Sequence, residues 1–174
     1  PLAAHSYNNI AIAYRTKGEL DTALEYYNKS LCIRVKTLGK DQPDIAGSYN
    51  NIAMIYRDQG ELDKALKYYH ASLDIKIKTL GEQHMDVAST YKDLAHVYND
   101  HGELEKSVEY LQKSVYIFQQ ILGENDPEMV TAYSNLGKLY GALSEPQKAF
   151  EYLNKSLTIK AHNLGSKHPL QICS

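Results

Sequence analysis

The chain of 174 residues repeats itself every 42 residues, and this period constrains its fold more than any other feature. Four leucine–glycine pairs mark the period, at Leu38-Gly39, Leu80-Gly81, Leu122-Gly123 and Leu164-Gly165. A fixed period between about 20 and 50 residues is typical of solenoids, in which each repeat covers the apolar face of its neighbour. The sequence therefore predicts a row of stacked units with a long curved surface, and not a closed pocket.

Each repeat contains two helical patterns, which are clearest in the second repeat. Gly60 is placed to end the first helix, because glycine adopts the left-handed conformation without strain. A second pattern with helical spacing runs from about Leu62 to Leu80. We expect every repeat to be a pair of antiparallel helices, helix A and then helix B, and the fold to be all-α. The apolar stripe of this first helix A consists of Tyr49, Ile52, Ala53 and Tyr56.

The period also sets the expected domain organisation, which is one solenoid over residues 1–174. Residues 169–174 begin like helix A of a fifth repeat. Solenoid ends normally carry a polar cap, whereas the last helix B keeps the apolar pattern of the earlier ones. We therefore expect the chain to be a fragment of a longer array. The four expected repeats are 1–42, 43–84, 85–126 and 127–168.

The fourth repeat departs from the others at the turn between its two helices. Ser144 stands where the other repeats have glycine, and Gln147 follows three residues later. This spacing predicts a capping box, with Pro146 in the first turn of the helix.

Tyrosine dominates the aromatic residues, with fifteen tyrosines, two phenylalanines and no tryptophan. Fourteen of the tyrosines recur at four repeat positions, and only Tyr116 stands apart. A residue type that follows the period most simply packs between helices, so we expect a buried aromatic ladder.

The overall composition excludes several classes of function. The net charge of −2 provides no field that would favour nucleic acid or an anionic membrane. No apolar run approaches the roughly 20 residues of a membrane span. Two cysteines, Cys32 and Cys173, occupy unrelated repeat positions, which favours a reducing compartment, and we expect the cytoplasm.

No pattern of residues points to catalysis. The seven histidines lack the spacing of a metal site, and the chain has no glycine-rich loop of the phosphate-binding type. We expect a protein that is not an enzyme and that uses neither a cofactor nor a metal.

The second repeat resembles the tetratricopeptide repeat signature of large, apolar and small residues. Its usual period is 34 residues. The eight-residue surplus here, with the Leu-Gly-x-x-x-Pro join from Leu122 to Pro127, is similar to the longer repeats of kinesin light chains and their relatives. The likeness covers about the whole chain, and it is more specific for the fold than for kinesin light chains. The residues that carry it are Tyr49, Ile52, Ala53, Tyr56, Gly60, Ala65, Tyr69 and Ser72.

This resemblance implies a right-handed superhelix in which helix A lines a concave groove and helix B forms the convex outside. Such grooves bind extended peptides or helices of other proteins. In kinesin light chains they recognise cargo adaptors, often through acidic segments with an aromatic anchor.

The exposed face of helix A supplies candidate binding residues independently of the resemblance. Asn9, Asn51 and Asn135 recur in mid-helix, where asparagine is a mediocre helix former. Their amides carry a donor and an acceptor that match an extended peptide, although they are equally suited to bonds within the helix pair or to solvation. The third repeat departs with Asp93. The candidate residues are Asn8, Asn9, Arg15, Asn50, Asn51, Met54, Arg57, Lys92, His96, Asn135 and Lys138.

Three functions follow from these observations. The first is an adaptor module that binds a peptide segment of a partner, with the basic residues receiving carboxylates. The second is a structural spacer or a self-assembling solenoid whose exposed ends stack on other copies. The third is a regulatory domain that senses a peptide.

Overall fold

The described part of the protein is an α-solenoid of four helix pairs. The structure is a computed structural model that describes residues 2–39 and 42–165, and this part of the chain contains eight helices and no strand. The expected all-α fold is confirmed. Residues 169–174, expected to begin a fifth helix A, lie outside the described residues. The helices are α1 (Leu2–Thr16), α2 (Leu20–Leu38), α3 (Pro43–Asp58), α4 (Leu62–Leu80), α5 (Met85–Asp100), α6 (Leu104–Leu122), α7 (Pro127–Ala142) and α8 (Pro146–Gly165).

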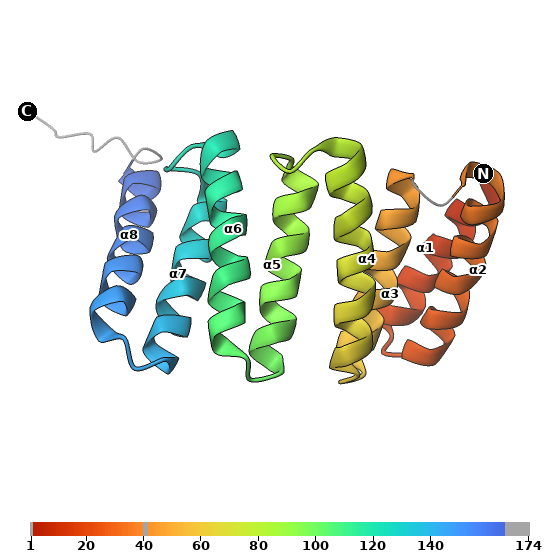
Figure 1. Ribbon diagram of the computed structural model, residues 1–174, viewed down its shortest axis with the longest axis horizontal. Coiled ribbons are helices and arrows are strands. Elements are labelled where there is room, and N and C mark those ends of the chain that lie inside the picture. Colours follow the sequence, from red (N-terminus) through yellow and green to blue (C-terminus); the bar gives the residue numbers. More distant parts are fainter. Residues whose placement is uncertain (1, 40–41, 166–174) are drawn as a thin grey trace, which may run out of the picture.

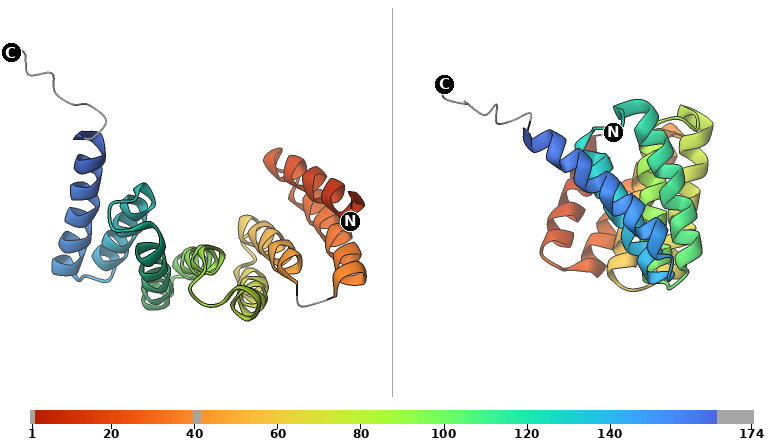
Figure 2. Two further views of the ribbon diagram at one scale, coloured as in Figure 1. Left: turned by 90° about the horizontal axis from the view of Figure 1, so that it is seen from above. Right: turned by 90° about the vertical axis from the view of Figure 1, so that its left-hand side faces the viewer.

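The helices stand in a row in chain order (Figure 1). Each odd-numbered helix is a helix A and packs against the helix B that follows it, and α2, α4 and α6 also pack against the next helix A. The row is curved, and the odd-numbered helices lie along its inner side while the even-numbered helices form its outer side (Figure 2). Helix A of each repeat therefore lines the concave side of the row.

The turn between α7 and α8 keeps the shape of the other turns without a glycine. Gly102 ends α5 with a φ of 84°, and Ser144 takes the matching place with a φ of 59°. Because an N-cap residue needs extended backbone, the expected capping box at Ser144 is wrong. Instead, the amide of Glu145 donates to the carbonyl of Tyr140 at 2.9 Å, as the amide of Glu103 does to that of Tyr98. Pro146 begins α8, as expected.

The periodic tyrosines pack inside each helix pair. In the first repeat the ring of Tyr26 on α2 stacks on Tyr14 at 5.5 Å between centroids and lies 5.9 Å from Tyr7. The same three-ring cluster recurs in the other three repeats. Tyr27 and Tyr69 are almost fully buried between repeats, whereas the side chain of Tyr116 is 57% exposed. The expected packing role of the periodic tyrosines is confirmed.

Candidate functional site

The candidate residues all lie on the odd-numbered helices, which form the inner side of the row (Figure 2). The structure does not leave them equally accessible to a ligand, because several of them bond to one another or to acidic residues. Their environments differ between the first two junctions and the third, where a junction is the contact between two successive repeats.

The amides of the second repeat bridge to both neighbouring repeats. Asn51 Nδ2 donates to Asn8 Oδ1 at 2.9 Å, and Asn50 Nδ2 donates to Asp93 Oδ2 at 3.3 Å. Both bonds link the same pair of repeat positions on successive inner helices. Asn51 is the donor at the first junction, whereas Asp93, at the matching position, is the acceptor at the second, so the change to aspartate reverses the direction of the bond.

The arginines of the inner surface also bond to the next repeat. Arg15 Nε donates to Asp58 Oδ2 at 2.7 Å, and Arg57 Nε donates to Asp100 Oδ2 at the same distance. Each guanidinium is thus matched by a carboxylate before any ligand arrives. We call these two ion pairs and the two amide contacts the inner-face bridges; they are Asn8–Asn51, Asn50–Asp93, Arg15–Asp58 and Arg57–Asp100.

The third junction lacks these bridges. Lys92 and Asn135 occupy the positions of the amide pair, but Lys92 Nζ pairs with Glu128 and lies 5.5 Å from the centre of the Phe118 ring. Asn99 stands where the earlier repeats have arginine, and the acidic partner is replaced by Ala142. Within residues 2–39 and 42–165, the side chains of Asn135 and Lys138 make no hydrogen bond and no ion pair.

A cavity of about 140 Å³ opens at this third junction, between α5 and α7. We call it the junction pocket. His96, Asn135 and Lys138, which were candidates from the sequence, all contribute to its wall. Its complete lining is Ala95, His96, Asn99, Ser107, Leu111, Asn135, Lys138, Leu139 and Ala142.

The polar groups of the junction pocket are arranged around an apolar floor. Burial, with the nearby Arg57 and Lys92, lowers the pKa of His96, so its imidazole is neutral at neutral pH. Asn99 and Asn135 supply amides with both donors and acceptors, and Lys138 supplies an exposed cation. The pocket can therefore receive a small apolar side chain while its rim bonds to a peptide backbone and to a carboxylate.

Asp93 adds an acidic group beside this region. Burial raises the pKa of its carboxyl group, although Lys92, Lys76 and Arg57 act in the opposite direction. Asp93 accepts the hydrogen bond from Asn50, so it belongs to the bridges of the second junction.

The sequence candidates include three of the nine residues that line the junction pocket, and Asn99 is the one side-chain amide among the six that they miss. The sequence did contain a signal for Asn99, because it aligns with Arg15 and Arg57, which were candidates in the first two repeats. The remaining candidates, Asn9 and Met54, lie on α1 and α3 and do not reach the pocket.

A larger and more open hollow of about 800 Å³ lies between α6 and α8, on the helix B side of the row. Tyr116, Phe150 and Tyr152 are among its lining residues. None of the candidate residues lines this hollow. The one feature of the sequence that pointed to this hollow was Tyr116, which is the one tyrosine that does not follow the 42-residue period.

Two other kinds of site are absent from residues 2–39 and 42–165. No group of three or more histidine, cysteine, aspartate or glutamate side chains there is arranged to hold a metal ion. None of the helices in this part of the chain has the length and hydropathy needed to cross a bilayer.

Comparisons with known proteins agree with the observed fold. Sequence models of the tetratricopeptide repeat match residues 3–44, 44–115 and 92–161. No curated protein sequence matches significantly.

Solved structures of similar shape include two that share more than a quarter of their residues with this chain. The crystal structure of BtubC (BKLC) from P. vanneervenii is 28% identical, with a TM-score of 0.89, and the match covers 98% of this chain and 68% of that one. The crystal structure of a putative kinesin light chain from Podospora anserina, described as having nearly identical TPR-like repeats, is 27% identical with a TM-score of 0.82, and the match covers 95% and 78%. MamA, at 18% identity and a TM-score of 0.70, shares the fold.

The sequence models span most of the chain, and the helix pairs, the tyrosine clusters and the turns follow one period throughout. The protein belongs to the tetratricopeptide repeat family and resembles the repeat domains of kinesin light chain-like proteins.

Proposed function

We propose that the protein is a non-catalytic adaptor module that binds an extended peptide segment of a partner on its inner surface, with the junction pocket as the main contact. Tetratricopeptide repeats serve as protein-interaction modules, which supports this class of function. The observation that carries the finer proposal is the third junction, where the side chains of Asn135 and Lys138 have no polar partner among the described residues and lie beside a cavity. At the first two junctions the residues that match Asn135, which are Asn51 and Asp93, are bonded to the protein itself.

The binding mechanism relies on a surface that is ordered before the ligand arrives. The inner-face bridges hold the first three repeats in a fixed relation, so the cost of ordering falls mainly on the peptide. Asn99 and Asn135 hold the peptide backbone, and the cavity seats one small apolar side chain.

The inner surface offers fewer unpaired cations to an acidic ligand than its four basic candidate residues would suggest. Arg15, Arg57 and Lys92 are each paired with a carboxylate of the protein. Lys138 is therefore the cation of the candidate set that receives a ligand carboxylate. We propose a ligand with one acidic residue next to its apolar anchor, presented in the cytoplasm.

The test begins with an array of random peptides that vary in acidic content, and its best binder is then measured by fluorescence titration. Asn135→Ala combined with Lys138→Glu removes a backbone contact and reverses the receiving charge, so the affinity falls by about tenfold or more. Lys67→Glu makes the same charge reversal at an exposed position of α4, away from the pocket, and leaves the affinity unchanged.

Two results would contradict this proposal. Equal affinity of the wild type and the Asn135→Ala, Lys138→Glu variant for the selected peptide would remove the junction pocket from the binding site. Failure of every peptide to bind would remove peptide binding as the function.

A further inference from the structure

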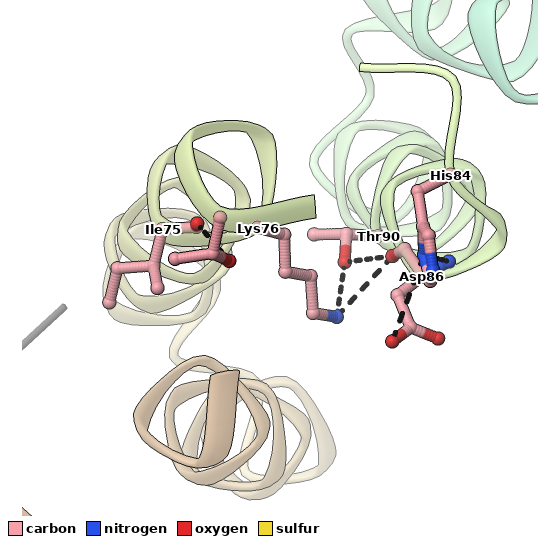
Figure 3. Close-up of polar contacts among 6 residues, drawn as sticks. Ile75, Lys76, His84, Asp86 and Thr90 are labelled. Atoms are coloured by element: carbon pink, nitrogen blue, oxygen red, sulfur yellow. Dashed lines mark hydrogen bonds and ion pairs between the residues drawn. The ribbon is translucent and has the colours of Figure 1, made fainter. Parts of the chain in front are cut away.

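The first two junctions share four polar links at matching positions, and at each junction the inner-face bridges supply two of the four. A third link joins a buried cation to a hydroxyl group of the next repeat. Lys76 extends from α4 toward α5, where its Nζ donates to Thr90 Oγ1 at 2.7 Å and to the carbonyl of Asp86 at 3.4 Å (Figure 3). At the matching positions of the first junction, Arg34 Nη1 donates to Ser48 Oγ at 2.9 Å.

The fourth link lies at the turn end of the repeats, by which we mean the end at which helix A turns into helix B. The turn ends form the lower edge of the row in Figure 1. Gln59 Nε2 donates to Asp21 Oδ1 at 2.7 Å across the first junction. At the matching positions of the second junction, His101 Nε2 lies 3.6 Å from Asp63 Oδ1. Because polar contacts depend on distance and direction, these links fix the orientation of one repeat on the next.

The third junction has none of these four links in the part of the chain that the structure describes. At the positions of the amide bridge, Lys92 and Asn135 are both polar, but Lys92 pairs with Glu128 instead. At the other three pairs of positions at least one residue lacks a polar side chain. These pairs are Phe118 with Ala132, Asn99 with Ala142, and Glu105 with Leu143.

Apolar packing holds the third and fourth repeats together. Val115 and Phe118 of α6 belong to the same buried cluster as Leu136 and Leu139 of α7. Because the burial of apolar surface has no preferred direction, packed helices can slide on one another over short distances while they stay in contact. The third junction therefore keeps its attraction but fixes the orientation of the fourth repeat less firmly.

Two of the polar contacts that cross the third junction lie at the opposite end of the repeats. Lys92 pairs with Glu128 in the first turn of α7. Asn163 Nδ2, near the end of α8, donates at 3.1 Å to the carbonyl of Asn125 in the loop before α7. We call this the loop end, and it forms the upper edge of the row in Figure 1. These contacts hold the fourth repeat at its loop end.

The junction pocket lies at the turn end, where the inner side of the third junction has no polar link among the described residues. Asn99 and Ala142, near the ends of α5 and α7, and Ser107, near the start of α6, all line the pocket. A third polar contact crosses the junction from the outer helix, where Gln112 Nε2 donates to Tyr140 Oη at 3.0 Å. The inner mouth of the pocket can therefore widen and narrow while the loop end stays in place.

We propose that the third junction is a hinge on which the fourth repeat turns against the first three, and that a peptide bound in the junction pocket closes this hinge. The pivot is the loop end, beside Glu128 and Asn125, and the movement is largest at the turn end, beside Asn99 and Ala142. A peptide in the pocket meets α5, α6 and α7, so it favours the orientations in which both repeats contact it. The closing step rests on the proposed function, whereas the hinge itself does not.

Distances between spin labels, measured by pulsed electron paramagnetic resonance after the native cysteines are replaced by serine, test the hinge without a ligand. Labels at Lys67 and Glu151 span the second and third junctions, and labels at Glu25 and Glu109 span the first and second. All four side chains are exposed and occupy the same position in their repeats. We expect a broader distance distribution for the first pair, because only that pair spans the third junction.

Two double variants that rebuild links of the earlier junctions test the cause of this breadth. Asn99→Arg with Ala142→Asp supplies the ion pair of the inner face at two exposed positions. Glu105→Asp with Leu143→Gln supplies the turn link of the first junction, and both positions lie outside the pocket lining. Each double variant narrows the distribution of the first label pair, whereas Asn99→Arg alone, a cation without its partner, does not. Circular dichroism checks that the helix content is kept.

The closing step is tested by adding the peptide selected from the array. It narrows the distribution between Lys67 and Glu151 and leaves that between Glu25 and Glu109 unchanged. Equal widths for the two pairs in the free chain would overturn the hinge. A peptide that binds in the fluorescence titration without narrowing the first distribution would overturn the closing step and leave the proposed function standing. If no peptide binds, the proposed function and the closing step both fail, while the widths in the free chain still decide the hinge.

Discussion

At the scale of single residues, the same side chain has different roles according to what the neighbouring repeat supplies. Asn51 bonds to Asn8 of the preceding repeat, while Asn135, at the matching position, has no such partner in the described part of the chain. Sequence reasoning weighed a ligand contact against a bond within the helix pair, and a bond between repeats was not considered. This distinction depends on which residue lies opposite, which the period alone does not determine.

The tyrosine clusters predict how stability depends on alkaline pH. Burial, with the neighbouring Tyr98 and Glu109, raises the pKa of Tyr110 to about 12, from an ordinary value of 10.0. The folded state therefore keeps a proton that the unfolded state releases above pH 10. The stabilising contribution of this residue is complete below pH 10 and is lost as the pH rises toward 12.

Urea unfolding at a series of pH values, followed by circular dichroism, measures this effect. The free energy of unfolding falls above pH 10 in the wild type, and the decline is shallower in Tyr110→Phe. Tyr116→Phe, which removes a 57% exposed phenol, is the control and retains the wild-type slope. Equal slopes for Tyr110→Phe and the wild type would show that this residue does not contribute to the alkaline loss.

At the scale of helices and turns, the period predicts the elements well. The first helix of the second repeat runs from Pro43 to Asp58, next to Gly60, and the second runs from Leu62 to Leu80, as the sequence indicated. These boundaries depend on local conformational preferences of proline and glycine, which a sequence displays directly. The turn at Ser144 was interpreted wrongly, because a serine that replaces glycine in a left-handed position looks the same in sequence as an N-cap serine.

The left-handed turns predict a reciprocal pair of substitutions. Ser144 has a φ of 59°, which strains a residue with a side chain, so Ser144→Gly stabilises the protein by about 0.5–1 kcal/mol after the added freedom of the unfolded chain is subtracted. Gly102→Ser destabilises it by a similar amount. A side chain at Gly102 would meet no atom within 4 Å, so this loss reports on backbone conformation alone.

Chemical denaturation of the two variants beside the wild type gives these differences. Gly141→Ser, in the last turn of α7 and without positive φ, serves as the control for replacing a glycine by serine. A Ser144→Gly variant that is less stable than the wild type would mean that the serine side chain makes a favourable contribution at this turn.

At the scale of the whole molecule, the curved row divides its inner surface into a bonded part and an open part. The period predicted the row and the helix pairs, and the resemblance to the tetratricopeptide repeat implied that helix A, with the candidate residues, lies on the inner side. It did not predict that Arg15 and Arg57 pair with Asp58 and Asp100, because those residues are 43 positions apart and meet only after the repeats stack. It also did not predict the junction pocket, which arises where the fourth repeat lacks an acidic partner.

The most direct test of this division is an NMR titration of the chain with the best peptide from the array, observing the side-chain amides of asparagine. We expect the signals of Asn99 and Asn135 to shift in proportion to the bound fraction, while those of Asn50 and Asn51 stay in place because their amides are already bonded. Large shifts at Asn50 and Asn51, with Asn135 unmoved, would contradict it.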